Sequence, residues 1–281
     1  MSLSHGDFAF VSQLVRRETS IVLAPGKEYL VEARLVPVAR QTGAASVTDF
    51  LADLQRRPNP AYQQKIVDAL TTNETSWFRD REPFTALSDV VLPDLIPSRG
   101  ATRKLRLWSA ASSSGQEAYS LAITLQEDLP PGWSYEILGS DISTEMIKRA
   151  QQGEYSQVEV NRGLPASQLV QYFERAGAHW RVTPSLRRNV TFKLMNLTAP
   201  LPPMPPFDVI FLRNVLIYFD VATKKTVLRN VARLLRPDGW LFLGAAETTI
   251  GIDNSYERVA AGRTSAYRIR SAVPTGAAKR G

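Results

Sequence analysis

Apolar residues in the first ninety positions recur every three or four residues. Phe8, Val11, Leu14 and Val15 form the first such stripe, and this spacing is typical of one face of an amphipathic helix. No strand-like alternation of apolar and polar residues occurs before residue 100, so we predict a helical domain. Three further helices are expected, over residues 29–43, which include Pro37, over 47–57 after the capping residue Ser46, and over 61–73.

The pattern changes near residue 100, where short apolar segments begin to alternate with helical ones. Residues 104–112 alternate in polarity, as expected of a strand, and the helical segment that follows them ends before Pro130-Pro131-Gly132. Strands that alternate with helices are typical of a parallel, doubly wound α/β sheet. The expected strands are 104–112, 134–143, a segment opening at 207, 240–247 and 263–270, and the expected helices are 115–129, 144–153 and 222–239.

Three segments depart from this rhythm. Residues 154–195 show no helix–strand alternation and are predicted to be a small inserted subdomain. The proline-rich stretch 200–207 is expected to be a linker, and the final residues 271–281 lack core-forming side chains and are expected to be disordered. We therefore divide the chain into a helical domain with its linker (1–85), an α/β domain (86–270) and a tail.

The composition excludes several kinds of chemistry. The 281 residues include no cysteine and only two histidines, His5 and His179. Disulfides, thiolate metal sites and a cysteine nucleophile are therefore ruled out, and we expect no metal site. The first residues show no basic segment followed by an apolar run, and no segment approaches the ~18 apolar residues of a membrane span. We expect a cytoplasmic protein without membrane insertion.

The net charge of +7 is unevenly distributed, because the first ninety residues carry slightly more acidic than basic side chains. The positive excess therefore lies in the rest of the chain. It includes no dense basic block and no basic run interleaved with aromatic residues, which argues against nucleic-acid binding. A positive surface of this kind favours an acidic partner.

Residues 107–122 (LWSAASSSGQEAYSLA) lead from a predicted strand through small residues into a helix. This arrangement brings backbone close to a ligand at a helix N-terminus. Gly115 is the only glycine, so the segment lacks the fingerprints of dinucleotide and Walker A sites. Glu117 favours a cationic ligand such as a sulfonium over a phosphate; the alternative is that it only complements the helix macrodipole.

Polar residues also end or interrupt two later strands. Asp141 ends the second predicted strand, where related folds place an acid that accepts ribose hydroxyls; the alternative is that it caps the next helix, a role that Ser143 can also fill. Arg213 and Asn214 interrupt an apolar run at the expected carboxyl edge of the sheet. Tyr218 faces the same crevice if a helical turn begins there. Otherwise Arg213 pairs with a neighbouring helix and Tyr218 belongs to the core.

Six segments together resemble the chemotaxis protein methyltransferase (CheR) family. In chain order they are TTNETSWFRD, WSAASSSGQEAYSLA, SDISTEMIKRAQQGEYS, the pair Asn196-Leu197, FDVIFLRNVLIYFD and LLRPDGWLFLGAAE. The first segment, taken alone, would be interpreted as a polar loop with a helix cap. Each segment is weak by itself, but six in the family's order and spacing, from about residue 71 to 247, are highly specific.

The resemblance implies an N-terminal helical domain and a class I methyltransferase domain with a small inserted β-subdomain. It also implies an enzyme that moves a methyl group from S-adenosylmethionine to glutamate side chains on cytoplasmic helices of chemoreceptors, leaving S-adenosylhomocysteine. By position in the motifs, Arg79 and Tyr218 would lie nearest the transferred methyl group. The cofactor would be contacted by Asn73, Thr75, Arg79, Ala110, Glu117, Asp141, Asn196, Leu197, Asn214 and Val215.

This activity agrees with the absence of a catalytic histidine or cysteine. A glutamate side chain with a pKa of about 4.3 is already ionised at neutral pH, so it attacks a sulfonium methyl group without a general base. The enzyme must then supply alignment and a dry pocket. Arg79 is suited to holding the attacking carboxylate by a charge-assisted hydrogen bond. Tyr218 is suited to donating a hydrogen bond or to shaping the path of the methyl group.

Two segments differ from the family pattern. Gln116-Glu117-Ala118-Tyr119 stands where Glu-Glu-Pro-Tyr is usual, which retains the second acid but loses the rigidity of proline at the helix start. Residues 172–186 are shorter than in members whose β-subdomain binds a receptor's C-terminal pentapeptide. We therefore predict that this protein works without such tethering.

Partners and rival functions follow from the remaining features. Arg34 and Arg40 on the second predicted helix are candidates for docking an acidic receptor helix, and the alternative is that they belong to a solvated surface.

Two rival functions are a class I methyltransferase acting on RNA or a small molecule, and a signalling module that binds S-adenosylmethionine or S-adenosylhomocysteine without catalysis. No feature marks an oligomer interface, so we expect a monomer.

Overall fold

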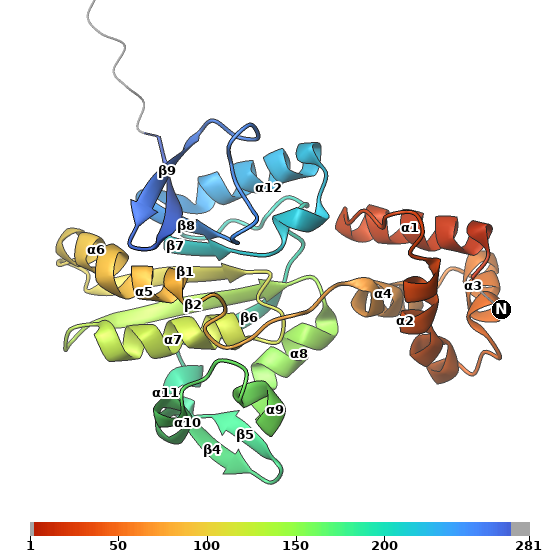
Figure 1. The fold of residues 1–281 in the computed structure, drawn as a ribbon, viewed down its shortest axis with the longest axis horizontal. Coiled ribbons are helices and arrows are strands. Elements are labelled where there is room, and N and C mark those ends of the chain that lie inside the picture. Colours follow the sequence, from red (N-terminus) through yellow and green to blue (C-terminus); the bar gives the residue numbers. More distant parts are fainter. Residues whose placement is uncertain (1–2, 271–281) are drawn as a thin grey trace, which may run out of the picture.

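The computed structural model describes residues 3–270. Its N-terminal part consists of four helices, α1 (His5–Thr19), α2 (Glu28–Gln41), α3 (Val47–Arg56) and α4 (Pro60–Leu70), which lie beside the rest of the molecule (Figure 1). The apolar stripes that predicted these helices pack together in one core. The expected helical domain is therefore confirmed.

The second part is built on a seven-stranded sheet with the strand order β6-β2-β1-β7-β8-β10-β9. The strands from β6 to β8 are parallel to their neighbours, whereas β10 runs antiparallel to both β8 and β9. The expected α/β sheet is confirmed, with one antiparallel strand and with β9 as a strand that the sequence did not predict. The bounds are β1 (Lys104–Ala110), β2 (Ser134–Asp141), β6 (Val190–Leu194), β7 (Phe207–Leu212), β8 (Leu235–Leu243), β9 (Tyr256–Ala261) and β10 (Thr264–Ile269).

Helices cover both faces of this sheet (Figure 1). Successive residues of β1 point to opposite faces, so Leu107 belongs to one core and Trp108 to the other. The first core also includes α5 (Glu82–Ala86), the π-helical turn η1 (Leu87–Val91), α6 (Leu92–Ser98), α7 (Gln116–Asp128) and α8 (Thr144–Gln152). The second packs against α12 (Val221–Leu234). No helix within residues 3–270 is long and apolar enough to cross a membrane.

The helix expected over 222–239 is shorter than predicted, because α12 ends at Leu234 and β8 begins at the next residue. The pairing of β7 with β8 has an irregularity between Phe207 and Val209. Opposite this irregularity, Arg236 forms an ion pair with Asp208 (3.0 Å). The Arg-Pro-Asp-Gly segment (236–239) has no partners in β7, so it forms a bulge of β8 between the pairs Phe207–Leu235 and Val209–Trp240.

A small separate sheet follows α8. Its antiparallel strands pair in the order β3-β5-β4, and only Gly177 and Ala178 connect β4 to β5. The range 154–195 expected for an insertion also includes β6, which is an edge strand of the main sheet. The tail expected at 271–281 lies outside the described residues. The elements are β3 (Glu154–Ser156), α9 (Gln157–Val160), α10 (Ala166–Tyr172), β4 (Phe173–Ala176), β5 (His179–Val182) and α11 (Pro184–Arg187).

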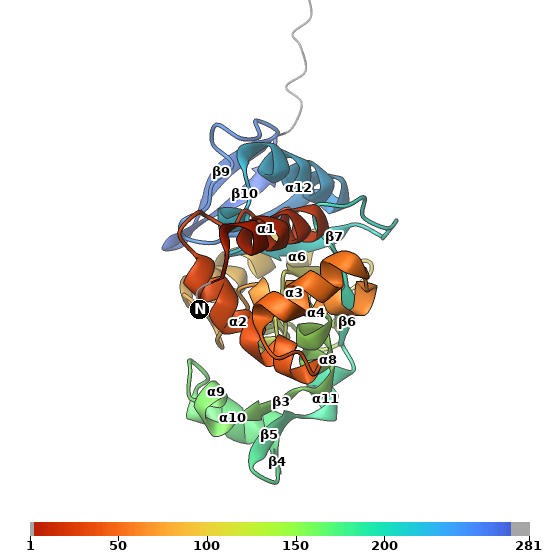
Figure 2. The ribbon, with the colours of Figure 1, turned by 90° about the vertical axis from the view of Figure 1, so that its right-hand side faces the viewer.

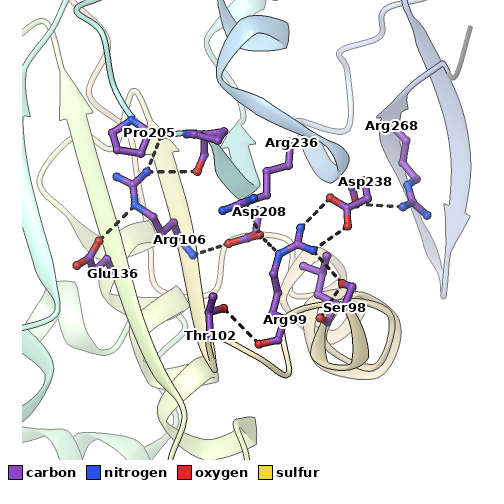
Figure 3. A network of polar contacts seen from close by, with 12 residues as sticks. Ser98, Arg99, Thr102, Arg106, Glu136, Pro205, Asp208, Arg236, Asp238 and Arg268 are labelled. Carbon is purple, nitrogen blue, oxygen red and sulfur yellow. Dashed lines mark hydrogen bonds and ion pairs between the residues drawn. The ribbon is translucent and has the colours of Figure 1, made fainter.

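A buried carboxylate joins several segments near the start of β7 (Figure 3). Asp208, 1% exposed, pairs with Arg99 Nε (2.6 Å) and Arg236 Nε (3.0 Å) and accepts a hydrogen bond from the backbone N–H of Arg106 (2.8 Å). Arg99 also donates two hydrogen bonds to Asp238 (2.7 and 2.8 Å), and these two carboxylates raise the pKa of Arg99. The network fastens the segment between α6 and β1 to β7 and β8.

We expect Asp208→Ala to lower the free energy of unfolding by about 3–5 kcal/mol, because it leaves buried cationic groups without a partner. Arg56→Ala removes an exposed ion pair with Asp53 and should cost less than about 1 kcal/mol. Urea unfolding followed by circular dichroism measures both variants. Equal, small losses would contradict a stabilising role for Asp208.

Candidate active site

An open cleft of about 870 Å³ lies at the carboxyl ends of β1, β2 and β7. Open α/β sheets bind ligands at this edge. The helical domain lies across the same edge (Figures 1 and 2), so the cleft has walls from both parts of the chain. The lining residues are Thr19, Ile21, Thr71, Thr72, Asn73, Glu74, Thr75, Arg79, Ala111, Ser112, Ser113, Glu117, Asp141, Ile142, Met195, Asn196, Leu197, Arg213, Asn214, Val215, Tyr218 and Phe219.

The loop between β1 and α7 is held close to β2 by one acid. Asp141 Oδ2 accepts a hydrogen bond from Ser113 N (2.8 Å), and its Oδ1 accepts one from Ser143 N (2.9 Å). Burial raises the pKa of Asp141, and the hydrogen bonds from backbone N–H groups oppose that rise. Ala111 and Ser113 both have positive φ angles, 60° and 49°, so the loop curves sharply along the edge of the cleft.

The sequence left open whether Asp141 caps the next helix, α8. In the structure other residues form that cap. Ser143 Oγ accepts a hydrogen bond from Met146 N at the start of α8. Asp68 of α4 accepts two more, from Thr144 N (3.1 Å) and Thr144 Oγ1 (2.8 Å). The helical domain is thereby joined to the first turn of α8, next to the cleft.

A buried arginine lies under the opposite wall of the cleft. The Arg213 side chain, 1% exposed, pairs through Nη1 with Glu117 Oε2 (3.0 Å) and through Nη2 with Asp80 Oδ2 (2.6 Å). Its Nη2 also donates to the carbonyl oxygen of Arg79 (2.9 Å), and Ser109 Oγ donates to Glu117 Oε1 (2.8 Å). Burial raises the pKa of Glu117, while Arg213 and Ser109 oppose the rise. Arg213 therefore does pair with a neighbouring helix, and Glu117 does more than complement a helix dipole.

The segment that connects the helical domain to α5 carries Arg79 into this wall. The Trp77 side chain is buried, and the backbone N–H of Trp77 donates to Arg162 O (3.1 Å), while Phe78 N donates to Ser120 Oγ (3.0 Å). Phe78, Asp80 and Arg81 have φ angles of 45°, 67° and 47°. Such left-handed backbone is uncommon outside glycine and persists where surrounding contacts hold it. The Arg79 guanidinium reaches the cleft and donates to Glu74 O (2.9 Å).

The turn after β7 depends on an acid that sequence reasoning missed. Glu247 accepts hydrogen bonds from three backbone N–H groups, those of Gly244 (2.7 Å), Asn214 (2.8 Å) and Ile217 (3.2 Å). Asn214 has a φ of 59°, and the 3₁₀ turn η2 (Leu216–Tyr218) follows it. Glu247 is the last residue of the strand predicted over 240–247, and an acid at the end of a predicted strand is the same signal that singled out Asp141.

Most of the predicted site residues line this one cleft. Ala110 does not, because it is buried within β1 and its neighbour Ala111 lines the cleft instead. Asn196 lines the cleft, but its amide also joins the two domains, since Nδ2 donates to Glu18 O (2.8 Å). The predicted residues that line the cleft are Asn73, Thr75, Arg79, Glu117, Asp141, Asn196, Leu197, Asn214, Val215 and Tyr218.

The two arginines proposed for docking lie outside the cleft on α2. Arg34 Nη1 donates to Leu70 O (3.2 Å) and Thr71 O (3.3 Å), so its guanidinium binds the last carbonyl groups of α4. Arg40 is exposed near the end of α2. Among residues 3–270, no group of His, Asp and Glu side chains could hold a metal ion.

The strand order, the antiparallel β10 and the cleft at the carboxyl ends of the parallel strands agree with the class I S-adenosylmethionine-dependent methyltransferase fold that the sequence resemblance implies. Residues 73–265 match the family described as CheR methyltransferase, SAM binding domain, and residues 6–71 match CheR methyltransferase, all-alpha domain. The chain belongs to the CheR methyltransferase family. The family, fold class and cofactor expected from the sequence are confirmed.

Named relatives cover nearly the whole chain. A "Chemotaxis protein methyltransferase 1" of Pseudomonas aeruginosa is 37% identical over 278 residues, 96% of this chain and 100% of that one. A "Chemotaxis protein methyltransferase" of Vibrio parahaemolyticus is 38% identical over 96% of this chain and 99% of its own length. A "Chemotaxis protein methyltransferase" of Salmonella typhimurium is 39% identical over 88% of this chain and 85% of its own length.

The residues of the cleft fit S-adenosylmethionine. A carboxylate has about four lone-pair sites, and Asp141 uses two of them for backbone N–H groups, which leaves acceptors for ribose hydroxyls. Glu117 also lines the cleft, and Ser109 and Arg213 hold its carboxylate in place. Apolar walls for a flat base are provided by Ile142, Met195, Leu197 and Phe219.

Glu247→Ala is expected to weaken binding of S-adenosylhomocysteine about tenfold or more, since each buried donor left without an acceptor costs roughly 1–3 kcal/mol and the turn carrying Asn214 loosens. Isothermal calorimetry measures the affinity. Glu257→Ala, an exposed acid on β9, is the control and should bind as the wild type does. Unchanged affinity in a folded Glu247→Ala protein would show that the turn does not need this acceptor.

Proposed function

We propose that this protein transfers the methyl group of S-adenosylmethionine to glutamate side chains on cytoplasmic helices of chemoreceptors. The observation that carries the proposal is that Arg79 and Tyr218, from segments far apart in the sequence, border one cleft together with the candidate cofactor residues. An arginine at the open cleft suits an anionic substrate side chain. The relatives named chemotaxis protein methyltransferases support the same assignment.

The positions of the polar side chains in the cleft support the cofactor roles that the motifs imply. Asp141 would accept the ribose hydroxyls, and Glu117 would face the cationic end of the cofactor. Asn73 and Thr75, from the segment after α4, would close the cleft from the side of the helical domain. The remaining lining positions assigned to the cofactor are Arg79, Asn196, Leu197, Asn214 and Val215.

The chemistry asks little of the protein beyond orientation. Bound S-adenosylmethionine supplies an electrophilic methyl group, and a glutamate with a pKa of about 4.3 is an ionised nucleophile at neutral pH. Arg79 uses one of its five N–H donors on Glu74 O, so others are free to hold the substrate carboxylate. The Tyr218 side chain lines the same cleft, where its hydroxyl would be available to the substrate.

We further propose that methylation proceeds without docking of a receptor's C-terminal pentapeptide, by a cytoplasmic monomer. The support is the turn between β4 and β5. It consists of Gly177 and Ala178 alone, with Gly177 at a φ of 61°, and so short a turn offers no loop that would enclose a peptide.

The deciding experiment is transfer of labelled methyl from S-adenosylmethionine to cytoplasmic receptor fragments. We expect base-labile label on the receptor, because carboxyl methyl esters hydrolyse in base, and equal rates with and without the pentapeptide. Bulk RNA and a small-molecule extract are the parallel substrates. Label on either of them alone would favour a different methyltransferase, and cofactor binding without any labelling would favour a non-catalytic module.

Arg79→Ala should lower kcat for receptor methylation by about 100-fold, the loss expected when a reacting group is misplaced by ~1 Å. The binding of S-adenosylhomocysteine should fall less. Arg81→Ala is the matched control, because Arg81 lies two residues away, is exposed and does not line the cleft. Turnover near wild type at saturating cofactor and receptor would exclude the role proposed for Arg79.

A further inference from the structure

The exposed face of α12 carries an unbroken line of positive charge. Lys225, Arg229 and Arg233 are four residues apart and exposed, and Lys224 beside them is half-buried. Residues at this spacing lie above one another on one helix face. The helix VATKKTVLRNVARL contains four basic residues and no acid. We call Lys225, Arg229 and Arg233 the α12 stripe.

This arrangement works against the stability of the N-terminal half of the helix, whereas Arg233 in the last turn is favourable to the macrodipole. Like charges four residues apart repel each other by a few tenths of a kcal/mol per pair. Lys224 and Lys225 also lie near the N-terminal end of α12, where the helix macrodipole disfavours cations. A helix selected only for stability would place acids here.

The stripe also differs from most other arginines of the α/β domain. Arg99, Arg149 and Arg213 are each paired with an acid at 3.0 Å or less, whereas within residues 3–270 no side chain of the stripe forms an ion pair. The acid nearest in sequence, Asp220, caps α12 by accepting from Thr223 N (2.8 Å). The charge of the stripe is therefore not neutralised within the described chain.

The stripe begins beside the cleft. Tyr218, which lines the cleft, precedes the first residue of α12 by only three positions. Arg16 of α1 reaches Asp220 across the domain boundary (3.5 Å), and both ribbon views place α1 next to α12 (Figures 1 and 2). A rod-shaped substrate whose side chain enters the cleft beside Tyr218 would reach the stripe by running along α12.

We propose that the α12 stripe is an electrostatic docking face for an acidic helix that flanks the methylated glutamate. This inference rests on the proposed function. The stripe extends over about 12 Å, with a charge every ~6 Å, and acids four residues apart on a partner helix repeat at the same distance. Such complementarity speeds encounter and holds the register of the partner.

The structure favours a helical protein over other acidic surfaces. The apolar side of α12, Val227, Leu228 and Val231, is buried against the sheet, so this helix has no free apolar face to insert into a membrane. The helix also contains no aromatic residue, and aromatic platforms are what proteins use to bind single-stranded nucleic acid.

The test compares the triple variant Lys225→Gln, Arg229→Gln, Arg233→Gln with a control of equal charge, Arg103→Gln, Arg188→Gln, Arg258→Gln. The control residues are exposed and lie away from the cleft. Receptor methylation and receptor-fragment binding by fluorescence anisotropy are measured at low and high salt. We expect the stripe variant to raise the receptor KM and Kd about tenfold at low salt, an effect typical of steering charges, and to lose most of the salt dependence. Affinity for S-adenosylhomocysteine should stay at the wild-type value in both variants.

The outcomes separate this inference from the proposed function. If the wild type methylates the receptor and both variants share its KM and Kd, the stripe is not the docking face, although the proposed function stands. If the wild type binds receptor fragments without labelling them, the proposed function fails and the Kd values still decide on the stripe. If the wild type binds no receptor fragment, both ideas fail. Stripe-dependent binding to anionic vesicles or RNA, with receptor binding unchanged, would also overturn the proposal.

Discussion

The burial of one cation, Arg213, constrains the active-site wall more than any other interaction. A guanidinium at the end of a buried strand must find acids or lose several kcal/mol, and Arg213 finds Glu117 on α7 and Asp80 on the connecting segment. Asp80 and Arg79 O both bind Arg213, and these contacts hold the left-handed backbone of that segment. The side chain of Arg79 is thereby presented to the cleft. The need of the buried Arg213 for acidic partners thus also positions Arg79, the candidate substrate-binding residue.

Carboxylates that accept backbone N–H groups organise the other walls in the same manner. Asp141 joins the loops after β1 and β2, and Glu247 accepts hydrogen bonds from backbone N–H groups in the turn after β7. Asp68, from the helical domain, caps α8. Each acid fixes a loop that has little apolar surface of its own to bury. Charged acceptors form stronger hydrogen bonds than neutral ones, so a few such residues hold an open cleft in shape without filling it. The contact of Asp68 with α8 means that the helical domain is part of this framework.

Much of this architecture was predictable because local chemistry and tertiary packing agree. The helices of the N-terminal domain, the strands β1, β2 and β7 and the small-residue loop before α7 all follow from periodicity and from polar residues at strand ends. The strands β6 and β9 escaped prediction, since short edge strands depend on their neighbours for pairing more than on their own pattern. The end of α12 was placed too late, because the Arg-Pro-Asp-Gly segment forms a bulge at the start of β8 and not the last turn of the helix.

The sequence by itself determined the family, the fold class and the cofactor, because six motifs in order carry that information whatever the details of packing. It also placed Asp141, Arg213 and Tyr218 at one edge of a sheet, since the carboxyl ends of parallel strands converge. Only the tertiary structure decided which acids partner Arg213, that Glu247 supports the turn of Asn214, and that the amide of Asn196 also joins the two domains. Each of these is a contact between residues that are distant along the chain. The spacing of side chains in the sequence does not indicate which distant polar groups meet once the core has formed.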